Sequence, residues 1–356
     1  MQIEKILHSR ISQVDFENLN FGHYYSDHML YCEFKDGQWQ KPIVKPFGHL
    51  TLSPACLVFH YGQAVFEGMK AYKDLEGQVF LFRPEENFRR INHSAQRLEM
   101  PQIPESVFMQ GLQALIDIDQ EWIPTAYGQS LYIRPFMIAT EGVLAANPSK
   151  EYLFIMITTP ASAYYTYPLK VKIEQKYSRA ADGGVGFTKA AGNYAAAFYP
   201  ARLAQEEGYD QILWTDASTH MLIEESGTMN VFFRLDDRLI TAPAGGGILG
   251  GVTRKSIIDL ARQEGIEVEE RNLSVSELIK TLKDGLLKEA FGCGTAVVIN
   301  AFKIIGYEGE DFYLPNLAEA DHIAVRLKKR LLDIQHNLVE DPFGWRLKVE
   351  SRLVER

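Results

Sequence analysis

The sequence predicts an α/β protein with a mixed α+β fold in two domains. Its 356 residues, 46% of them apolar, can bury a large core, and a chain of this length usually forms more than one domain. Segments with helical periodicity alternate with short runs rich in β-branched and aromatic residues. The stretch ASAYYTYPLK (161–170) is small, aromatic and contains proline, as a connection does. We therefore expect domains over 1–160 and 171–356, joined by 161–170.

The individual elements follow from these periodicities. Apolar residues recur at helical spacing from Phe88 to Leu98, so a helix is expected over 88–99, ended by Pro101. Strands are expected where tyrosine, isoleucine, phenylalanine and threonine cluster. The further helices are placed near 106–122, 194–207, 252–264, 274–284 and 317–334. The strands are placed near 130–139, 151–160, 171–178, 211–215, 221–224, 228–234 and 238–241.

The composition argues against several classes of function. The net charge of −9 is spread along the chain without the basic block of a nucleic-acid-binding protein. The sequence has no apolar signal core and no apolar run of roughly 18 residues, so a cytoplasmic protein is expected. The three cysteines are far apart and the nine histidines lack metal-binding spacing, which indicates reduced thiols and no metal.

Lys189 is the first candidate for chemistry. It lies in GVGFTKAAGNYAAAF, where small and apolar neighbours would leave its ammonium poorly solvated and suited to act as a nucleophile. A lysine in an apolar run more often extends to water. The residues alone therefore leave both interpretations open.

A glycine-rich segment precedes one predicted helix. The segment 238–264 runs from a strand through glycines into a helix that begins near Val252, and free N–H groups at a helix start bind phosphate. The glycines of 245–250 also satisfy GxGxxG, with Glu270 at the distance expected of a ribose-binding acid. Because that pattern normally opens the first βαβ unit, a single phosphate is favoured over a dinucleotide.

Two further pairs of polar residues are candidates. Glu224 and Glu225 come where a strand begins, and a solvated turn is the simpler account of this pair. In the strand expected over 130–139, alternation places Tyr132 and Arg134 on one face. Their polar tips can reach one ligand, or both residues can belong to a strand at the surface.

Taken in order, eight segments resemble blocks of the branched-chain amino acid aminotransferases, which are fold-type-IV pyridoxal-phosphate enzymes. The resemblance spans nearly the whole chain. The segments are FGHYYSDHML (21–30), FHYGQAVFEGMKAYK (59–73), LFRPEENFRRINHSAQRL (81–98), SLYIRP (130–135), FTKAAGNY (187–194), IEESGTMNVF (223–232), GILGGVTRKSI (247–257) and FGCGTA (291–296). The resemblance implies reversible transfer of the amino group between L-leucine, L-isoleucine or L-valine and 2-oxoglutarate.

The resemblance also implies pyridoxal 5'-phosphate in a cleft between the two domains. Lys189 would bind the cofactor aldehyde and later move the substrate proton, while Glu225 would face the pyridine nitrogen. Arg90 would hold the phosphate and Tyr194 would bond the phenolic oxygen. The other expected cofactor contacts are Thr228, Val252, Thr253 and Thr295.

By the same resemblance, an aromatic pocket selects branched aliphatic side chains. Its walls would be Phe21, Tyr61, Phe66, Tyr132 and Tyr164. The backbone N–H groups of Thr295 and Ala296 would bind the α-carboxylate. We further expect the polar tips of Tyr61, Tyr132 and Arg134 to accept the distal carboxylate of glutamate. Leu144 matches a position that enters the neighbouring subunit's pocket in this family, which implies a homodimer.

The sequence departs from the family in one respect. Some relatives carry a CxxC pair where this chain has Val297 and Asn300, so thiol regulation of that kind is not expected. A D-amino acid aminotransferase or an aminodeoxychorismate lyase on the same fold is the nearest alternative, although both usually lack the pattern of Tyr132 and Arg134. A non-catalytic or dinucleotide-binding protein would require Lys189 to be incidental.

Overall fold

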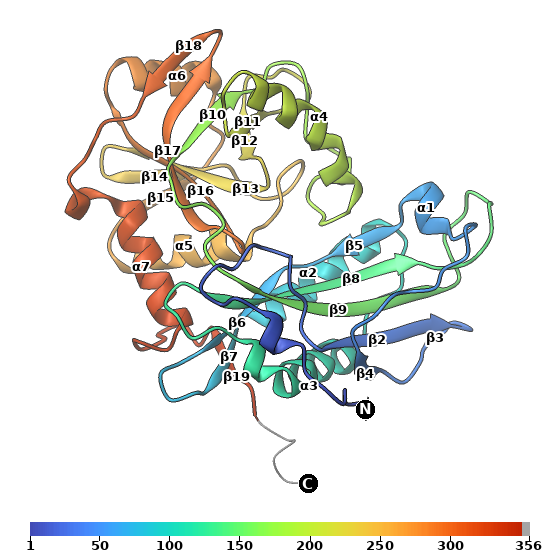
Figure 1. Ribbon diagram of the computed structural model, residues 1–356. Coiled ribbons are helices and arrows are strands. Elements are labelled where there is room, and N and C mark those ends of the chain that lie inside the picture. Colours follow the sequence, from blue (N-terminus) through green and yellow to red (C-terminus); the bar gives the residue numbers. More distant parts are fainter. Residues whose placement is uncertain (351–356) are drawn as a thin grey trace. The chain divides into compact units, whose positions relative to one another are not determined.

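A computed structural model describes residues 1–350, which divide into two compact units (Figure 1). The first unit contains Met1–Tyr164, Thr188–Ala191 and residues 333–350, and the second contains Tyr165–Phe187 and Gly192–Leu332. This division differs from the expected one, which placed Lys189 and the C-terminal residues in the second domain. The physical reason for the first difference is that the main chain at Lys189 is hydrogen-bonded to strand β5 of the first unit.

The first unit contains a sheet of ten strands among the described residues. Strands β8 and β9 pair antiparallel along their whole length, from Ser130 opposite Ala161 to Ala139 opposite Tyr152. The strand order is β1 (Gln2–Ile3), β4 (Ile43–Pro46), β2 (His28–Lys35), β9 (Tyr152–Ala161), β8 (Ser130–Ala139), β6 (Met69–Lys73), β7 (Val79–Phe82) and β19 (Arg346–Lys348), with β3 (Gln38–Trp39) on β2 and β5 (Ala64–Phe66) on β8.

Helix α2 (Pro84–Arg97) carries one of the predicted site residues, Arg90. It starts four residues before the predicted helix because Pro84 stands at a first helical position and two acids follow in the first turn, both favourable at a helix start. Its apolar face joins the core of the unit through Ile91 and Ala95. The remaining helical elements here are α1 (Leu57–Tyr61), α3 (Gly111–Ile118), a π-helical turn η2 (Ser106–Gln110) and the 3₁₀ turns η1 (Ile11–Gln13) and η3 (Gln120–Trp122).

The second unit is built on a sheet of nine strands, counted over the described residues. Strand β12 pairs with both β11 and β13, so the path from β12 through β11, β10, β17 and β16 to β13 closes on itself. The strands are β10 (Leu169–Ile173), β11 (Gln211–Thr215), β12 (Ile223–Ser226), β13 (Met229–Leu235), β14 (Arg238–Thr241), β15 (Glu267–Glu270), β16 (Leu287–Gly294), β17 (Val298–Tyr307) and β18 (Glu310–Tyr313).

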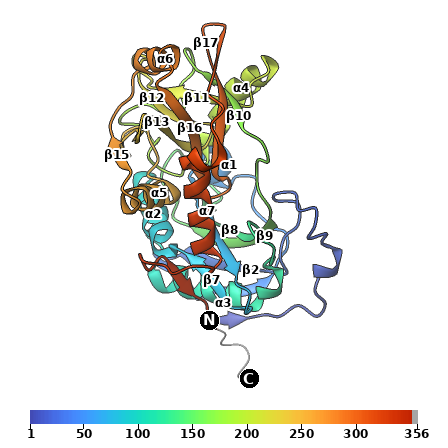
Figure 2. The same ribbon diagram turned by 90° about the vertical axis from the view of Figure 1, so that its left-hand side faces the viewer.

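Helices lie on both sides of this second sheet. Figures 1 and 2 both show α4 (Gly192–Glu206) and α6 (Val275–Lys283) on opposite sides of its strands. The others are α5 (Val252–Gln263), α7 (Ile323–Gln335) and the 3₁₀ turn η4 (Glu319–Asp321). No helix within residues 1–350 combines the length and the apolar character that crossing a bilayer requires.

Candidate active site

Lys189 lies on a short loop that is fastened to strand β5. The Phe66 N–H donates to the Lys189 carbonyl at 3.1 Å, and the Ala191 N–H donates to the Ala64 carbonyl at 3.0 Å. The Lys189 N–H donates to Oγ of Ser94, on helix α2, at 3.0 Å. The main chain is thus held on two sides, while the Lys189 amine lies 4.7 Å from the centre of the Phe66 ring.

A fully buried acid, Glu67, lies at the end of the same strand. Arg90 donates to both of its carboxylate oxygens, from Nε at 2.6 Å and from Nη2 at 2.8 Å. The Asn87 amide and the Gly68 N–H donate to Oε2 at 2.7 and 3.0 Å. Burial alone would raise the pKa of Glu67, but the charges of Arg90 and, less strongly, Lys189 together with these hydrogen bonds hold it below its ordinary value.

The predicted phosphate anchor is therefore oriented by an acid that the sequence reasoning missed. Arg90 is mostly buried, with 12% of its side chain exposed, and the bidentate pair with Glu67 fixes its plane. A signal for Glu67 was present in the sequence, because it is a lone acid in the apolar run QAVFEGMKAY. A charge in such a run requires a partner.

Four of the five aromatic residues predicted for the substrate pocket form one set near Lys189. The Phe21 ring contacts the rings of Tyr132 and Tyr164 edge-on, with centroids 4.9 and 5.7 Å apart. Arg134 donates to the Tyr132 hydroxyl at 2.9 Å, and its guanidinium carbon lies 4.6 Å from the Phe66 ring centre. Phe66 is also the ring beside Lys189, so these residues form one continuous set within the first unit.

Gly68 makes room for the polar end of this set. A Cβ on Gly68 would lie 2.2 Å from the Tyr132 hydroxyl oxygen, far inside van der Waals contact. Any side chain at position 68 would displace the hydroxyl from Arg134. The glycine is therefore needed for the close approach and not for an unusual backbone angle.

Tyr61 and Leu144 form a separate contact. The Tyr61 hydroxyl donates to the Leu144 carbonyl at 2.8 Å, and both side chains are exposed. Phe59 and Val143 are exposed beside them in the chain. No ring contact within residues 1–350 links Tyr61 to Phe21, Tyr132 or Tyr164, so the expected five-membered aromatic wall is not one set.

In the second unit, the side chain of Glu225 is almost completely buried on strand β12. Its Oε1 accepts from the Asn230 amide at 3.0 Å and from the Leu249 N–H at 2.9 Å. Its Oε2 lies 2.9 Å from Nε of Arg179, a buried arginine. The carboxylate is thus held by three groups from three different segments.

Glu224 is not the exposed turn residue that the sequence suggested for this pair. It lies on strand β12, partly buried, and its Oε2 has no hydrogen-bond partner among the described residues. Burial raises the pKa of Glu224 to about 7; the Arg179 charge opposes this rise, while Glu225 and Asp216 add to it. A short-range sequence pattern could not show this, because the burial comes from distant segments.

Helix α5 begins at Val252, as predicted. Leu249, whose N–H donates to Glu225, lies just before it in the chain. Its N-cap is Gly251, which offers no side-chain cap, so the first N–H groups of the helix are available to an anion. A Cβ on Gly251 would lie 2.1 Å from Oδ1 of Asn230, the residue that also donates to Glu225. Thr253 lies buried in the first turn.

The acid that a dinucleotide site would require is already paired. Glu270 accepts from Arg254 at 3.0 Å and from Arg262 at 3.1 Å, both on helix α5. Burial raises the pKa of Glu270, but the two arginines more than offset this and lower it. This pairing argues against a ribose contact at Glu270, while the single phosphate at the helix start stays a prediction.

The remaining predicted residues lie on turns or helix starts of the second unit. Thr295 and Ala296 occupy the tight turn between β16 and β17, closed by the pairing of Gly294 with Val298. Val298 has a φ of 60°, which is rare for a β-branched residue and fixes this turn tightly. Thr228 is in the turn after β12, and Tyr194 is partly buried near the start of α4.

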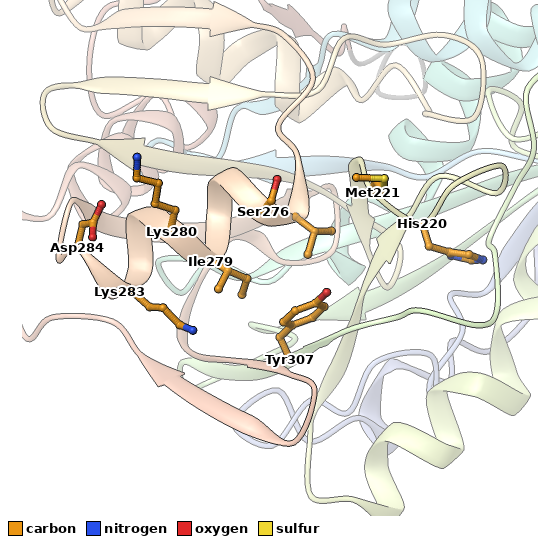
Figure 3. Close-up of a pocket in the computed structure, with 9 residues that line it drawn as sticks. His220, Met221, Ser276, Ile279, Lys280, Lys283, Asp284 and Tyr307 are labelled. Carbon is orange, nitrogen blue, oxygen red and sulfur yellow. The ribbon is translucent and has the colours of Figure 1, made fainter.

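A cavity elsewhere in the second unit contains none of the predicted residues. It has a volume of about 440 Å³ and lies between helix α6, strand β17 and the loop before β12. In Figure 3, Ile279 of α6 and Tyr307 of β17 lie close together, and the Lys280 amine points away from them. Among the described residues, no cluster of acids, histidines or cysteines has the arrangement of metal ligands.

The sequence between residues 64 and 304 matches the family model described as "Amino-transferase class IV". The matched region holds Lys189, Arg90 and Glu225. The chain belongs to the class IV aminotransferases. The family expectation drawn from the eight sequence blocks is thereby confirmed, and with it the expectation of an aminotransferase.

Individual class IV relatives resemble the chain over nearly its full length. A "probable branched-chain-amino-acid aminotransferase" of Staphylococcus aureus (strain MRSA252) is 46% identical over 340 residues, 94% of each chain. "Branched-chain-amino-acid transaminase 1" of Bacillus subtilis (strain 168) is 41% identical, covering 94% of this chain and 95% of the relative. The solved "branched-chain amino acid aminotransferase from Thermobaculum terrenum in PLP-form (holo-form)" covers 91% of this chain and 98% of its own, with 22% identity and a TM-score of 0.73, and supports the fold.

Proposed function

We propose that this class IV aminotransferase is a pyridoxal-phosphate-dependent branched-chain aminotransferase. It transfers the amino group of L-leucine, L-isoleucine or L-valine to 2-oxoglutarate and runs in both directions. One observation supports the proposal best. In the first unit, the Lys189 amine lies over the Phe66 ring, and the Arg134 guanidinium faces the same ring. The names of the two close relatives support the same substrate class.

The residues of this chain fit pyridoxal 5'-phosphate. The cofactor has an aldehyde, a phosphate and a ring nitrogen, and the chain offers an amine, an oriented guanidinium and a buried carboxylate for these three groups. Lys189 would take the aldehyde and Arg90 the phosphate. Glu225, already fixed by Asn230 and Arg179, would face the ring nitrogen.

The phosphate is expected to have a second set of donors. The uncapped start of α5, at Val252 and Thr253, provides N–H groups and a hydroxyl for an anion, and Thr228 provides another hydroxyl. Thr295 also contributes as a donor. Tyr194 would bond the phenolic oxygen of the ring.

In the reaction, the bound cofactor supplies an electron-accepting ring that stabilises negative charge on the substrate Cα. The Lys189 amine would act as the general base and take the proton from the substrate Cα. The hydrogen bond from its N–H to Ser94 and the bond to Phe66 keep its main chain in place, which favours a proton transfer over a fixed short distance. Glu225, held by Asn230 and Arg179, would stabilise a positive charge on the ring nitrogen.

Substrate selection follows from the aromatic set. Phe21, Phe66, Tyr132 and Tyr164 offer a mainly apolar surface, which suits branched aliphatic side chains and leaves a cation without a partner. The turn at Thr295 and Ala296 would bind the α-carboxylate through its N–H groups. Arg134, joined to the Tyr132 hydroxyl, accommodates the distal carboxylate of glutamate.

The protein is further proposed to act as a homodimer in the cytoplasm. Support for the dimer is the exposed apolar patch of Phe59, Tyr61, Val143 and Leu144, which water solvates poorly. In this proposal Tyr61 and Leu144 together contribute to the substrate pocket of the neighbouring subunit. Light scattering of Leu144→Asp should then report a monomer while the wild type is a dimer. The three free, buried cysteines fit a reducing compartment, which cell fractionation tests.

The test of the proposed function has two parts. The purified protein should absorb visible light because of the bound cofactor, and borohydride reduction should leave the pyridoxyl group on Lys189. A panel of amino acids with 2-oxoglutarate should then favour branched aliphatic L-amino acids over L-alanine, by about tenfold or more, since each buried methylene contributes roughly 0.8 kcal/mol. Faster turnover of D-alanine than of L-leucine would instead support a D-amino acid aminotransferase.

A further inference from the structure

The carboxylate of Glu225 is held by an arginine that also fastens two loops. Arg179 Nη2 donates to the Gly186 carbonyl at 3.1 Å and to the Gly247 carbonyl. Its Nε makes the ion pair with Glu225. Arg179 therefore joins strand β12 to the segment before Lys189 and to the glycine loop before α5.

Glu224 lies against the same glycine loop. Its Oε1 is 2.9 Å and its Oε2 is 3.3 Å from the place a Cβ on Gly247 would occupy, so the carboxyl group packs directly on that residue. Oε2 accepts no hydrogen bond from the described residues. An acid in this position is withdrawn from water without receiving the donors that would stabilise its charge.

The charges near Glu224 come from three segments. Arg179 is the nearby cation, and Glu225 and Asp216 are nearby acids. Asp182 faces the same loop, with Oδ1 at 3.1 Å from the place of a Cβ on Gly246. Glu224 and Glu225, both on β12, thus experience the charge of the Arg179 guanidinium, but only Glu225 forms an ion pair with it.

We propose that Glu224 is a positioning residue that adjusts, through its own charge, how strongly Glu225 holds the cationic ring nitrogen of the cofactor. When Glu224 is ionised, the group of Glu224, Glu225 and Arg179 carries a net charge of about −1 by formal charges, which favours a cation at Glu225. When Glu224 is protonated, the group is neutral and Arg179 neutralises Glu225 alone. This inference rests on the proposed function.

The two states of Glu224 interchange in the neutral pH range. Its raised pKa, at about 7, results from burial, opposed by Arg179 and assisted by Glu225 and Asp216. Cofactor affinity should therefore increase between pH 6 and pH 8 by an amount that depends on Glu224. The ionisation of the cofactor itself affects every variant equally, so it cancels in a ratio between variants.

The experiment titrates the full-length protein, freed of cofactor, with pyridoxal 5'-phosphate and follows protein fluorescence from pH 6 to pH 8.5. The variants are wild type, Glu224→Gln, Glu224→Asp and, as a matched control, Glu267→Gln, which removes an exposed acid of the same unit. At pH 6 the dissociation constants of wild type and Glu224→Gln should agree. At pH 8 Glu224→Gln should bind roughly three- to tenfold more weakly, as expected for the loss of one nearby charge.

Glu224→Asp retains the charge and should retain the pH dependence, which separates charge from packing. If Glu224→Gln fails to fold, as judged by circular dichroism, Glu224→Asp alone decides the matter through a shifted midpoint of the same pH dependence. A ratio of wild type to Glu224→Gln that stays constant from pH 6 to pH 8.5, or a Glu224→Asp protein without pH dependence, overturns the proposal.

Failure of this inference is distinguishable from failure of the proposed function. A wild-type protein that binds no cofactor at any pH would contradict the proposed function. Binding with the label on Lys189, but with a constant ratio between wild type and Glu224→Gln, would contradict the role of Glu224 alone.

Discussion

Two acids that the fold withdraws from solvent, Glu67 in the first unit and Glu224 in the second, differ in the direction of their pKa shifts. Burial raises the pKa of both. In Glu67, the bidentate contact with Arg90 and two further donors outweigh burial. In Glu224, the nearby arginine contacts the neighbouring acid instead, and burial prevails.

Hydrogen-bond donors, more than depth of burial, decide the charges of these two acids. Glu67 is the more deeply buried of the two acids and is nevertheless the one that ionises readily. In the first unit the acid has a lowered pKa and, as an anion, orients an arginine. In the second unit, the partly solvated acid can change its charge near neutral pH.

The largest expected effect concerns Lys189, the amine that lies in the first unit together with Glu67. Lys189→Ala removes both the cofactor bond and the general base, and should lower kcat by about 10⁴-fold or more. Stopped-flow measurement of the half-reaction with L-leucine gives the rate. Lys176→Ala, which changes a lysine elsewhere in the chain, should keep near wild-type turnover; comparable losses in both variants would contradict the assignment.

Removing Glu67, the acid of the Glu67–Arg90 pair, should lower the free energy of unfolding. Glu67→Ala removes the buried carboxylate that pairs with Arg90, and breaking a buried ion pair typically costs about 3–5 kcal/mol in the free energy of unfolding. Urea denaturation at pH 7 measures this loss. Glu86→Ala, which removes the exposed pair with Arg89 on the same helix, should cost less than about 1 kcal/mol. Similar costs for both would mean that the Glu67 pair is not structurally important.

The pH dependence of the Glu67 contribution has a definite sign. The pKa of Glu67 is lowered in the folded protein, so its stabilisation is fully present above the unfolded value of about 4.5 and is lost as the pH falls through the folded value. The difference in stability between wild type and Glu67→Ala should therefore shrink in acid.

The next prediction compares the effects on kcat of replacing Glu225 and Glu224, the two neighbouring acids of β12. Glu225→Gln removes the charge that faces the ring nitrogen and should lower kcat by about a hundredfold. Glu224→Gln acts only through Arg179 and should lower kcat by less than tenfold at pH 8, with a smaller change at pH 6. Steady-state kinetics with L-leucine at both pH values decides, and equal losses at pH 6 would show that the roles of the two acids are assigned incorrectly.

A smaller effect is expected from Arg134, at the polar end of the aromatic set. Arg134→Leu should slow the half-reaction with glutamate by about tenfold while the half-reaction with leucine stays within about twofold, because only glutamate carries a distal carboxylate. Single-turnover kinetics with each substrate measures the two rates. If both rates fell together, Arg134 would have a structural role in holding Tyr132.

An effect of comparable size is expected for Glu224 itself, this time on stability. The pKa of Glu224 is raised in the folded protein, so its favourable contribution is complete below the unfolded value of about 4.5 and is lost as the pH rises through about 7. Glu224→Gln should then stabilise the cofactor-free protein by about 1–2 kcal/mol at pH 8, after allowance for solvent screening, and should give little difference near pH 4.5. Thermal unfolding at both pH values provides the measurement.

Elements with a strong local pattern could be predicted from the sequence. Strands β8, β11 and β14 were placed at their observed bounds, and α5 was placed within one residue. Strands such as β2 and β16 were not predicted, because their glycine, cysteine and charged residues lack a clear alternation and their pairing partners are distant in sequence. Helix α7 begins at Ile323, later than predicted, because the residues before it form a 3₁₀ turn.

The candidate site could be predicted from the sequence where its residues lie in a recognisable family motif. The family and the enzyme class followed from the sequence blocks and are confirmed by the family match, whereas the roles of the individual residues stay predictions. What the sequence could not show was the pairing of charges. Glu67 and Arg90 are separated by 22 intervening residues, and the burial of Glu224 depends on a loop beyond residue 240.

The position of β19 at the edge of the first sheet has a consequence for handling this protein. This strand, Arg346–Lys348, pairs with β7, whose sequence VFLF is buried throughout. Deleting the segment from Arg346 onward would expose the unpaired N–H and C=O groups of an entirely apolar edge strand, which is a template for association between molecules. Loss of the chain from Arg346 onward by proteolysis would therefore be observed first as aggregation, before any change in the amino acids that the enzyme accepts.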